Sequence, residues 1–266
     1  MMLEHMLDLI HGAMRRATGL KLVSDLHERP TFPGIYPPLD PKLRCRLRRI
    51  RDAGVLFVHI PKNAGMSVSS ILYGEQVFHP TIRYYQRVAP DIARSLPSFA
   101  IWRHPVERFV SAFRYARTGG SQDAPISRAF QKTYRAFRTL DDALDHVATA
   151  NSLYQVDHIF RPQFWYIADH AGRIAVDNIC MIEDLDAMIA AKALPGLHEV
   201  ARLNRSEAID VALTPEQLQR LHDLYPIDFA IYDSLQQGLL AKRLTRPNPS
   251  FCGYEANTRP PLSISR

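Results

Sequence analysis

Cysteine is scarce in this sequence, and the few cysteines present are not paired. Cys45, Cys180 and Cys252 are the three in a chain of 266 residues, an odd number spread along its length. This spacing excludes a disulfide framework and the paired ligands of a zinc site. A reducing compartment is the simpler expectation. We also expect no metal at the functional site, because no other ligand cluster is evident.

Long apolar runs are missing as well. No stretch reaches the roughly 20 apolar residues that a membrane-spanning helix needs. The first part of the chain carries Glu4, His5 and Asp8 among its apolar residues and has its basic pair, Arg15 and Arg16, after them. That order is unlike a secretory signal. We therefore expect no transmembrane segment and a cytoplasmic location.

What is present is an ordinary globular composition with a basic balance. Hydrophobic residues make up 46% and charged residues 23% of the chain, which excludes wholesale disorder and a fibrous repeat. The net charge of +6 favours anionic partners such as nucleotides, sulfated or acidic glycans, nucleic acid or membrane surfaces. The densest basic run, "RCRLRRIR" at 44–51, could hold a polysaccharide, but a solvated helix face is the preferred interpretation.

The chain divides into three parts. An amphipathic helix and a proline-rich lead-in occupy 1–43, a single α/β domain occupies 44–240, and a polar, proline-rich tail occupies 241–266. Within the domain we predict strands at 55–60, 98–103, 173–176 and 179–183, helices at 65–73 and 105–116, a mixed helical region at 125–170, and a helix that begins at Thr214-Pro215. Continuous apolar strands that alternate with helices indicate a parallel sheet covered on both faces.

The first chemical motif is "VLFVHIPKNAGMSV" at 55–68, in which an apolar strand turns into a helix. Gly65 allows a tight turn, so the amides that begin the helix can point toward an anion, and Lys62 and Ser67 add an ammonium and a hydroxyl. A plain turn with a solvated lysine explains this stretch alone equally well. The segment lacks G-x-x-x-x-G-K-[ST], which disfavours a standard nucleoside triphosphatase loop.

The second motif is "IWRHPVERFVSAF" at 101–113. Pro105 suits the first turn of a helix, whose apolar positions form a buried stripe. Arg103 at the strand end and Ser111 on another helix face then offer a guanidinium and a hydroxyl to a phosphate monoester. For Arg108 we expect solvation or pairing with an acid.

Together the two motifs resemble the sulfotransferases that use 3′-phosphoadenosine 5′-phosphosulfate (PAPS), especially carbohydrate sulfotransferases and their bacterial relatives. Weaker similarity extends the match over roughly 54–233, through "VDHIFRPQFWYI", "MIEDLDAM" and "LNRS". The resemblance implies a three-layer, P-loop-like α/β fold with a central parallel sheet flanked by helices, PAPS as donor, and a glycan or other hydroxyl acceptor rather than nucleic acid. The implied 5′-phosphosulfate site comprises Lys62, Ala64, Gly65, Met66 and Ser67, and the implied 3′-phosphate site comprises Arg103 and Ser111. Asn204 and Arg205 are candidates for nucleotide contact, with a plain loop as the alternative.

The resemblance also implies in-line sulfuryl transfer, with Lys62 stabilising the leaving group and a base accepting the acceptor's proton. We favour His79 as this base, because the family often has a histidine or an acid near this point and histidine titrates near neutrality. His158 and Glu183 are competing candidates. His158, Arg161, Gln163 and Glu183 are also candidates for contact with the acceptor, whereas His59 is expected to be a packed core residue.

Two other functions remain open at this point. A kinase-like phosphotransferase with an unusual loop is disfavoured by the missing lysine–serine pair. A catalytically inactive protein that only binds a nucleotide or glycan is disfavoured by the intact Lys62, Arg103 and Ser111. The loop "TGGSQDAP" at 118–125 is either a mobile lid or a surface turn.

Overall fold

The computed structural model of the chain describes residues 10, 12–14, 16–28, 39–121, 124–191, 194, 197 and 213–238. The predicted tail at 241–266 and most of the proline-rich lead-in lie outside these residues. Of the helix predicted over 1–20, the described residues 10, 12–14 and 16–18 are helical. No helix among the described residues is long and apolar enough to cross a membrane.

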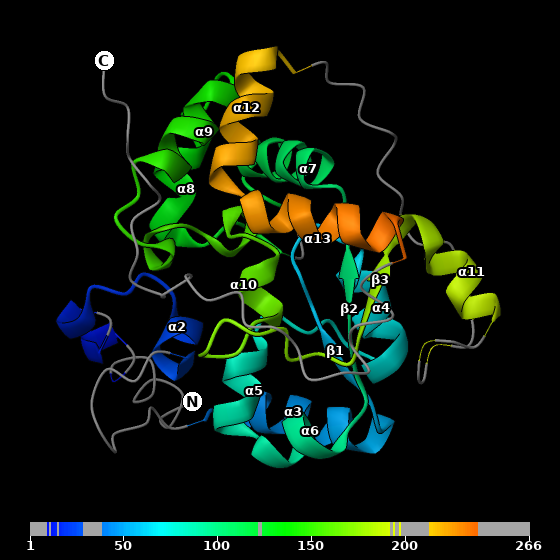
Figure 1. Cartoon of the computed structure of the whole chain (residues 1–266). Helices are drawn as coiled ribbons and strands as arrows, with labels where there is room; N and C mark the ends of the chain where they lie inside the picture. Colours follow the sequence, from blue (N-terminus) through cyan, green and yellow to red (C-terminus); the bar gives the residue numbers. More distant parts are fainter. Residues whose placement is uncertain are drawn as a thin grey trace.

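A parallel sheet forms the centre of the molecule (Figure 1). Its strands are β1 (Leu56–Val58), β2 (Ser98–Trp102) and β3 (Asn178–Met181), in the spatial order β1-β2-β3. Leu56 pairs with Ser98 and Phe99 with Asn178, so all three strands run in the same direction. Every residue of β1 and β2 is buried. Burial on both faces is the reason that these strands read as continuous apolar runs in the sequence.

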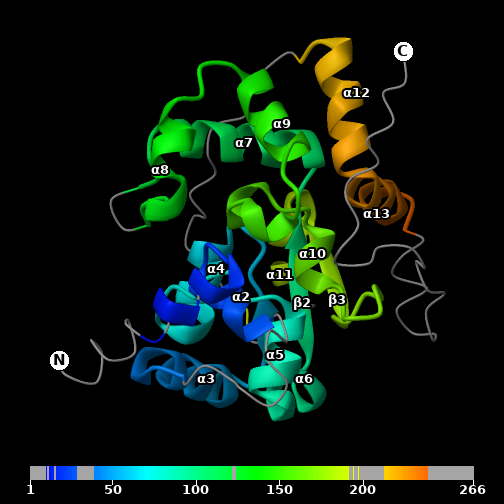
Figure 2. The same ribbon diagram turned by 90° about the vertical axis from the view of Figure 1, so that its left-hand side faces the viewer.

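Helices cover the sheet, as predicted. Figures 1 and 2 show α4 (Gly65–Tyr73) on one side of the sheet and α13 (Pro226–Gln236) on the other. The remaining helices are α2 (Val23–Glu28), α3 (Pro41–Ala53), α5 (Ile82–Val88), α6 (Pro90–Ser95), α7 (Pro105–Arg117), α8 (Arg128–Arg135), α9 (Leu140–Ala148), α10 (Phe164–Ile167), α11 (Leu185–Ala190) and α12 (Pro215–Leu224), with 3₁₀ turns η1 (Leu153–Gln155), η2 (His158–Phe160) and η3 (Ile182–Asp184). The three-layer α/β prediction is confirmed.

Local signals account for the helix starts. Pro105 opens α7 as expected. At α12, Thr214 Oγ1 accepts the N–H of Gln217 at 3.2 Å while Gln217 Oε1 accepts the N–H of Thr214 at 3.2 Å, a reciprocal cap that satisfies two backbone donors. The residues that predicted the starts of these helices, Pro105 and Thr214, are therefore the residues that begin or cap them in the structure.

One predicted strand is wrong. Residues 173–176 do not form a strand, although Ile174 makes a single bridge with Ala168. Asp169 draws this segment into a turn, because its Oδ1 accepts the backbone N–H groups of Ala171 and Arg173, both at 2.9 Å. This side-chain competition for backbone donors disrupts strand pairing. Only the second of the two adjacent strand predictions, at 179–183, corresponds to a strand of the sheet.

Part of the predicted lead-in is packed into the core. Leu20 and Leu26 are buried and belong to the same apolar cluster as the strands of the sheet. The predicted boundary at residue 44 falls inside α3, whose first turn is capped by Asp40 through a 2.7 Å bond from the N–H of Leu43. Residues 20–28 and α3 thus contribute to the folded body from a region that looked like a linker.

Candidate active site

The loop after β1 presents backbone N–H groups at the start of α4. Lys62 and Ala64 have positive φ angles of 70° and 59°, which non-glycine residues seldom adopt. The first backbone bond of the helix runs from the N–H of Val68 to the carbonyl of Ala64. The preceding N–H groups of Gly65, Met66 and Ser67 therefore have no helical acceptor, and the positive end of the helix dipole adds to them. This geometry suits an anion.

Gly65 is required here by a close approach of His59. A Cβ atom on Gly65 would lie 1.9 Å from Cδ2 of the His59 ring, well inside the contact limit. His59 is 2% exposed and its Nδ1 lies 2.6 Å from the carbonyl oxygen of Val77. Burial lowers the pKa of His59 to about 4, so the ring is neutral near pH 7. The expectation that His59 is a packed core residue is confirmed.

Lys62 places a cation beside this loop. Its Nζ lies 3.9 Å from the centroid of the Tyr115 ring, a cation–π contact. Burial, followed by the positive charges of Arg103 and Arg108, lowers the pKa of Lys62 to about 8. Three cationic side chains therefore gather at the carboxyl ends of β1 and β2. An anionic ligand would offset the repulsion among them.

Arg103 joins the second motif to the first. Its Nη1 donates to the carbonyl oxygen of Lys62 at 3.4 Å, and its Nε donates to Glu107 Oε2 at 3.1 Å. Ser111, further along α7, is 8% exposed. The two segments that the sequence treated as one site are therefore in contact, although 41 positions separate the two residues of the bond.

The expectation for Arg108 is wrong. Its side chain is not solvated, and within the described part of the chain it forms no ion pair with an acid: the residue is 2% exposed, and its guanidinium donates to the carbonyl oxygens of Pro61 at 3.1 Å and Arg161 at 2.7 Å. These carbonyls belong to loops, where no neighbouring strand supplies a donor. The fixed fork of the guanidinium can satisfy both at once. Arg108 thus fastens the first motif to the loop before α10.

Gln163 lies at the centre of a buried network. It is 0% exposed. Its Oε1 accepts from Asn63 Nδ2 at 2.7 Å and from the N–H of Arg103 at 3.1 Å, while its Nε2 donates to the carbonyl oxygen of Arg103 at 2.8 Å. Asn63 also donates to the carbonyl oxygen of Ile101 at 2.7 Å. These bonds favour a role in holding the two motifs together over direct contact with an acceptor.

Asp228 holds this network from α13. Its two carboxylate oxygens accept the backbone N–H groups of Gln163 at 2.7 Å and Phe164 at 2.9 Å, which lie at the start of α10. Burial raises the pKa of Asp228 to about 6. Nothing in the sequence indicated this contact, because an acidic residue in the first turn of a helix is usually explained by that helix alone.

Three histidine rings lie together beside the first loop. The His79 ring centroid is 4.2 Å from that of His59 and 5.8 Å from that of His158. Burial and then the nearby His59 and His158 lower the pKa of His79, and Lys62 contributes in the same direction. His79 Nδ1 lies 3.4 Å from the carbonyl oxygen of His59. A proton on Nδ1 leaves the lone pair of Nε2 able to accept another proton.

The other predicted acceptor residues differ in their surroundings. Arg161 is 0% exposed, and it pairs with Asp25. Glu183 lies in η3, immediately after β3, and burial followed by the charges of Glu107 and Asp184 raises its pKa. Its position completes a series in which Lys62, Arg103 and Glu183 follow the carboxyl ends of β1, β2 and β3. Ligands of open α/β sheets bind at this edge.

Several predictions lie beyond these observations. Asn204 and Arg205 are outside the described residues. Among the residues that the structure does describe, no group of three or more histidine, cysteine or acidic side chains is arranged to hold a metal ion.

The loop at 118–125 folds back on itself through a bridge between Gly120 and Pro125, and the hydroxyl of Tyr115 donates to the carbonyl oxygen of Ala124. Tyr115 thereby connects this loop to Lys62.

Comparison with known proteins adds one finding to this geometry. The model of the sulfotransferase family matches residues 46–233, which is well over half of the chain and includes both motifs. No curated protein matches the sequence.

Proposed function

This chain belongs to the sulfotransferase family, and from that premise we propose that it transfers a sulfuryl group from PAPS to a hydroxyl group on a carbohydrate or glycolipid. The observation that carries the proposal is the contact between the two motifs, in which Arg103 donates to the backbone of Lys62 beside the start of α4. A nucleotide with two separate anionic groups needs two anion sites at a fixed spacing. Two turns that do not contact each other would not hold two anion sites at a fixed spacing.

The donor would bind across both motifs. Its 5′-phosphosulfate would accept hydrogen bonds from the N–H groups of Gly65, Met66 and Ser67, with Lys62 and the backbone of Ala64 beside it. Its 3′-phosphate would bind Arg103 and Ser111. Asn204 and Arg205 remain candidates for further nucleotide contacts. The partial burial of these groups supports the assignment, because charge-assisted hydrogen bonds gain strength where water is excluded.

The transfer step uses His79 and Lys62. The acceptor oxygen attacks the sulfur atom in line as the bond from sulfur to the bridging phosphate oxygen breaks, and the acceptor's proton passes to Nε2 of His79. The Lys62 ammonium stabilises the negative charge left on the phosphate oxygen. The lowered pKa of His79 keeps the ring unprotonated near pH 7, as a proton acceptor must be.

The acceptor would approach from the side of β3 and η2. His158 and Glu183 are the candidates with partly exposed side chains there, whereas Arg161 and Gln163 are fully buried. We therefore assign Arg161 and Gln163 to holding the site in shape. The basic balance of the whole chain is compatible with an acidic or sulfated glycan.

Calorimetry tests the donor assignment. We expect 3′,5′-phosphoadenosine to bind the wild type more tightly than ATP does. Lys62→Ala and Arg103→Ala should each weaken binding by about tenfold to a hundredfold, as expected for charge-assisted contacts of roughly 1.5–3 kcal/mol. Tighter binding of ATP would favour the phosphotransferase alternative. Unchanged binding by Arg103→Ala would overturn the assignment of the 3′-phosphate site.

Sulfate transfer tests catalysis. With labelled PAPS and a panel of glycans, the wild type should release 3′,5′-phosphoadenosine and label an acceptor. His79→Ala should lower turnover by about 10²–10⁴-fold while it keeps nucleotide affinity. Nucleotide binding without turnover by the wild type on any acceptor would support the binding-protein alternative. Wild-type turnover in His79→Ala would remove His79 as the base.

A further inference from the structure

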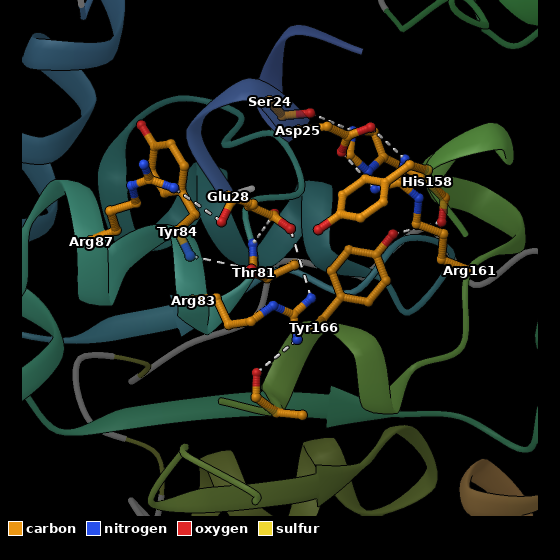
Figure 3. A network of polar contacts seen from close by, with 12 residues as sticks. Ser24, Asp25, Glu28, Thr81, Arg83, Tyr84, Arg87, His158, Arg161 and Tyr166 are labelled. Atoms are coloured by element: carbon orange, nitrogen blue, oxygen red, sulfur yellow. Dashed lines mark hydrogen bonds and ion pairs between the residues drawn. The ribbon is translucent and has the colours of Figure 1, made fainter. Parts of the chain in front are cut away.

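The short helix α2 precedes the segment that matches the sulfotransferase family, yet it is built into the candidate site. Asp25, Leu26, His27 and Glu28 are all buried. Figure 3 shows polar side chains of α2 directed toward residues of the η2 region and of α5. Two of these contacts, described below, are made to His158 and to Thr81, close to His79 in space or in the chain.

Ser24 makes the contact that lies nearest to the proposed base. Its Oγ lies 3.0 Å from Nε2 of His158, and the His158 ring in turn packs 5.8 Å, centroid to centroid, from the His79 ring. Among the described residues, the other ring nitrogen of His158 is buried and has no hydrogen-bond partner. The Ser24 hydroxyl is therefore the polar group that fixes how this ring is turned.

Glu28 holds the chain just after His79. Its Oε1 accepts the backbone N–H of Thr81 at 3.3 Å, two residues after His79. The Thr81 hydroxyl accepts the N–H of Tyr84 at 3.3 Å and so caps α5. Figure 3 shows these bonds in sequence, from α2 to Thr81 and on to α5. Helix α2 therefore contacts both His158, whose ring packs against that of His79, and the chain two residues after His79.

Asp25 fixes the position of α2 itself. Its two carboxylate oxygens accept from Nη1 and Nη2 of Arg161 at 2.7 and 2.8 Å, and both residues are 0% exposed. Arg161 follows His158 by three residues, so this bidentate pair sets the distance between α2 and η2. Bidentate geometry restrains rotation as well as separation. Ser24 is held opposite His158 as a result.

We propose that α2 completes the catalytic site and that Ser24 is a positioning residue. Its hydrogen bond to His158 fixes the orientation of that ring, and the His158 ring packs against His79 and so orients it. This inference rests on the proposed function, in which His79 is the base. A base displaced by a fraction of an ångström loses alignment with the acceptor's proton, and such losses lower turnover rather than nucleotide binding.

The test compares Ser24→Thr with Ser24→Val in the full chain. The two replacements have nearly the same shape, and only threonine keeps the hydroxyl. We expect Ser24→Val to lower kcat about tenfold with an unchanged KM for PAPS and an unchanged Kd for 3′,5′-phosphoadenosine, and Ser24→Thr to stay within about threefold of the wild-type kcat. Ser234→Ala, which removes a hydroxyl that donates to the backbone carbonyl of Ala230 in α13, is the matched control.

A second measurement does not depend on turnover. In protein labelled with ¹⁵N-histidine, Ser24→Val should shift the ring resonances of His158 and His79, whereas Ser24→Thr and Ser234→Ala should leave them unchanged. Equal kcat values for the threonine and valine variants, or unshifted histidine resonances in Ser24→Val, would overturn the inference. Absence of sulfate transfer by the wild type would instead count against the proposed function, and the resonances would still decide whether Ser24 orients the histidines.

Discussion

Gln163 makes two hydrogen bonds with the backbone of Arg103, accepting its N–H at 3.1 Å and donating to its carbonyl oxygen at 2.8 Å. Arg103 follows the last residue of β2, so Gln163 takes the place of a neighbouring strand where the sheet has ended. The same side chain accepts from Asn63 in the loop after β1. One buried amide therefore sets the spacing between the two proposed anion sites.

Replacing Gln163 should weaken nucleotide binding although the residue is fully buried. Gln163→Leu keeps the approximate size of the side chain but removes the partner of the N–H and carbonyl oxygen of Arg103 and one of the two acceptors of the Asn63 amide. Each unsatisfied buried group costs about 1–3 kcal/mol. We expect a lower free energy of unfolding in urea and about tenfold weaker binding of 3′,5′-phosphoadenosine by calorimetry. Gln155→Leu, at an exposed position, is the control. Equal affinity in the two variants would contradict the role given to Gln163.

Deprotonation of Lys62 should cause kcat/KM to fall at alkaline pH. In the proposed mechanism Lys62 acts as an ammonium, and its pKa is lowered to about 8 by burial and by the charges of Arg103 and Arg108. As the pH rises through this value the ammonium is lost, so kcat/KM should fall above about pH 8. The base must be unprotonated, and the lowered pKa of His79 means that activity should persist below pH 6.5.

Lys62→Arg provides the control for this assignment. Arginine keeps its charge at every pH in the range. The variant should lose the alkaline decline, even if its geometry lowers the rate at all pH values. Lys62→Met should lower kcat by about 10²–10³-fold, the usual effect of removing a group that stabilises charge in the transition state. An alkaline decline that survives in Lys62→Arg would assign it to another group.

The sequence could predict the elements that depend on neighbouring residues. An apolar run followed by glycine marked β1 and α4, and Pro105 marked the start of α7. That Lys62 and Arg103 belong to one site was implied by the family resemblance, and the sheet gives the physical reason: residues at the carboxyl ends of adjacent parallel strands share one edge. The elements themselves needed only short-range patterns.

The network that holds the site could not be predicted in this way. The bond between Ser24 and His158 spans 134 positions and that between Gln163 and Asp228 spans 65. No periodic pattern links residues at such separations. Arg108 was misplaced for a related reason: helical periodicity puts it outside the apolar stripe of α7, but loops on that side bury it and supply carbonyl acceptors. A polar position on a helix can be a buried anchor.

Enlarging Gly65 should disturb the anion site directly. A methyl group there would overlap the His59 ring, so Gly65→Ala requires that ring or the loop to shift. We expect a loss of about 1–3 kcal/mol in the free energy of unfolding and weaker binding of 3′,5′-phosphoadenosine. Gly65→Ala combined with His59→Ala has room for the methyl group and should recover part of the affinity. Wild-type affinity in the single variant would show that the loop geometry is not needed.

Breaking the pair between Asp25 and Arg161 should destabilise the whole domain. Asp25→Asn leaves the fully buried guanidinium without its counter-charge, which typically costs about 3–5 kcal/mol. The double variant Asp25→Leu/Arg161→Met removes both charges and should be less destabilised than Asp25→Asn. Urea unfolding of the three proteins tests this order. A double variant less stable than Asp25→Asn would show that the other bonds of Arg161, such as that from Nε to the carbonyl oxygen of Val156, matter more.

Tyr115 should affect the pKa of Lys62 through its ring rather than through its hydroxyl. The Lys62 ammonium lies 3.9 Å from the ring centroid, and the hydroxyl donates to the carbonyl oxygen of Ala124 in the adjoining loop. Tyr115→Phe keeps the ring, whereas Tyr115→Leu removes it. An exposed or partly buried cation–π contact is worth about 0.5–1 kcal/mol, so losing it should lower the pKa of Lys62 by about half a unit.

The alkaline decline of kcat/KM should therefore begin at a lower pH in Tyr115→Leu and at the wild-type pH in Tyr115→Phe. Phe113→Leu removes another aromatic ring from α7 without touching Lys62 and is the matched control. If the bond to the carbonyl oxygen of Ala124 were the more important contact, the alkaline decline would begin at the same lowered pH in Tyr115→Phe and in Tyr115→Leu, because both variants lack the hydroxyl. The two profiles thus separate an effect of the Tyr115 ring on the ammonium from an effect of the hydroxyl that bonds to the adjoining loop.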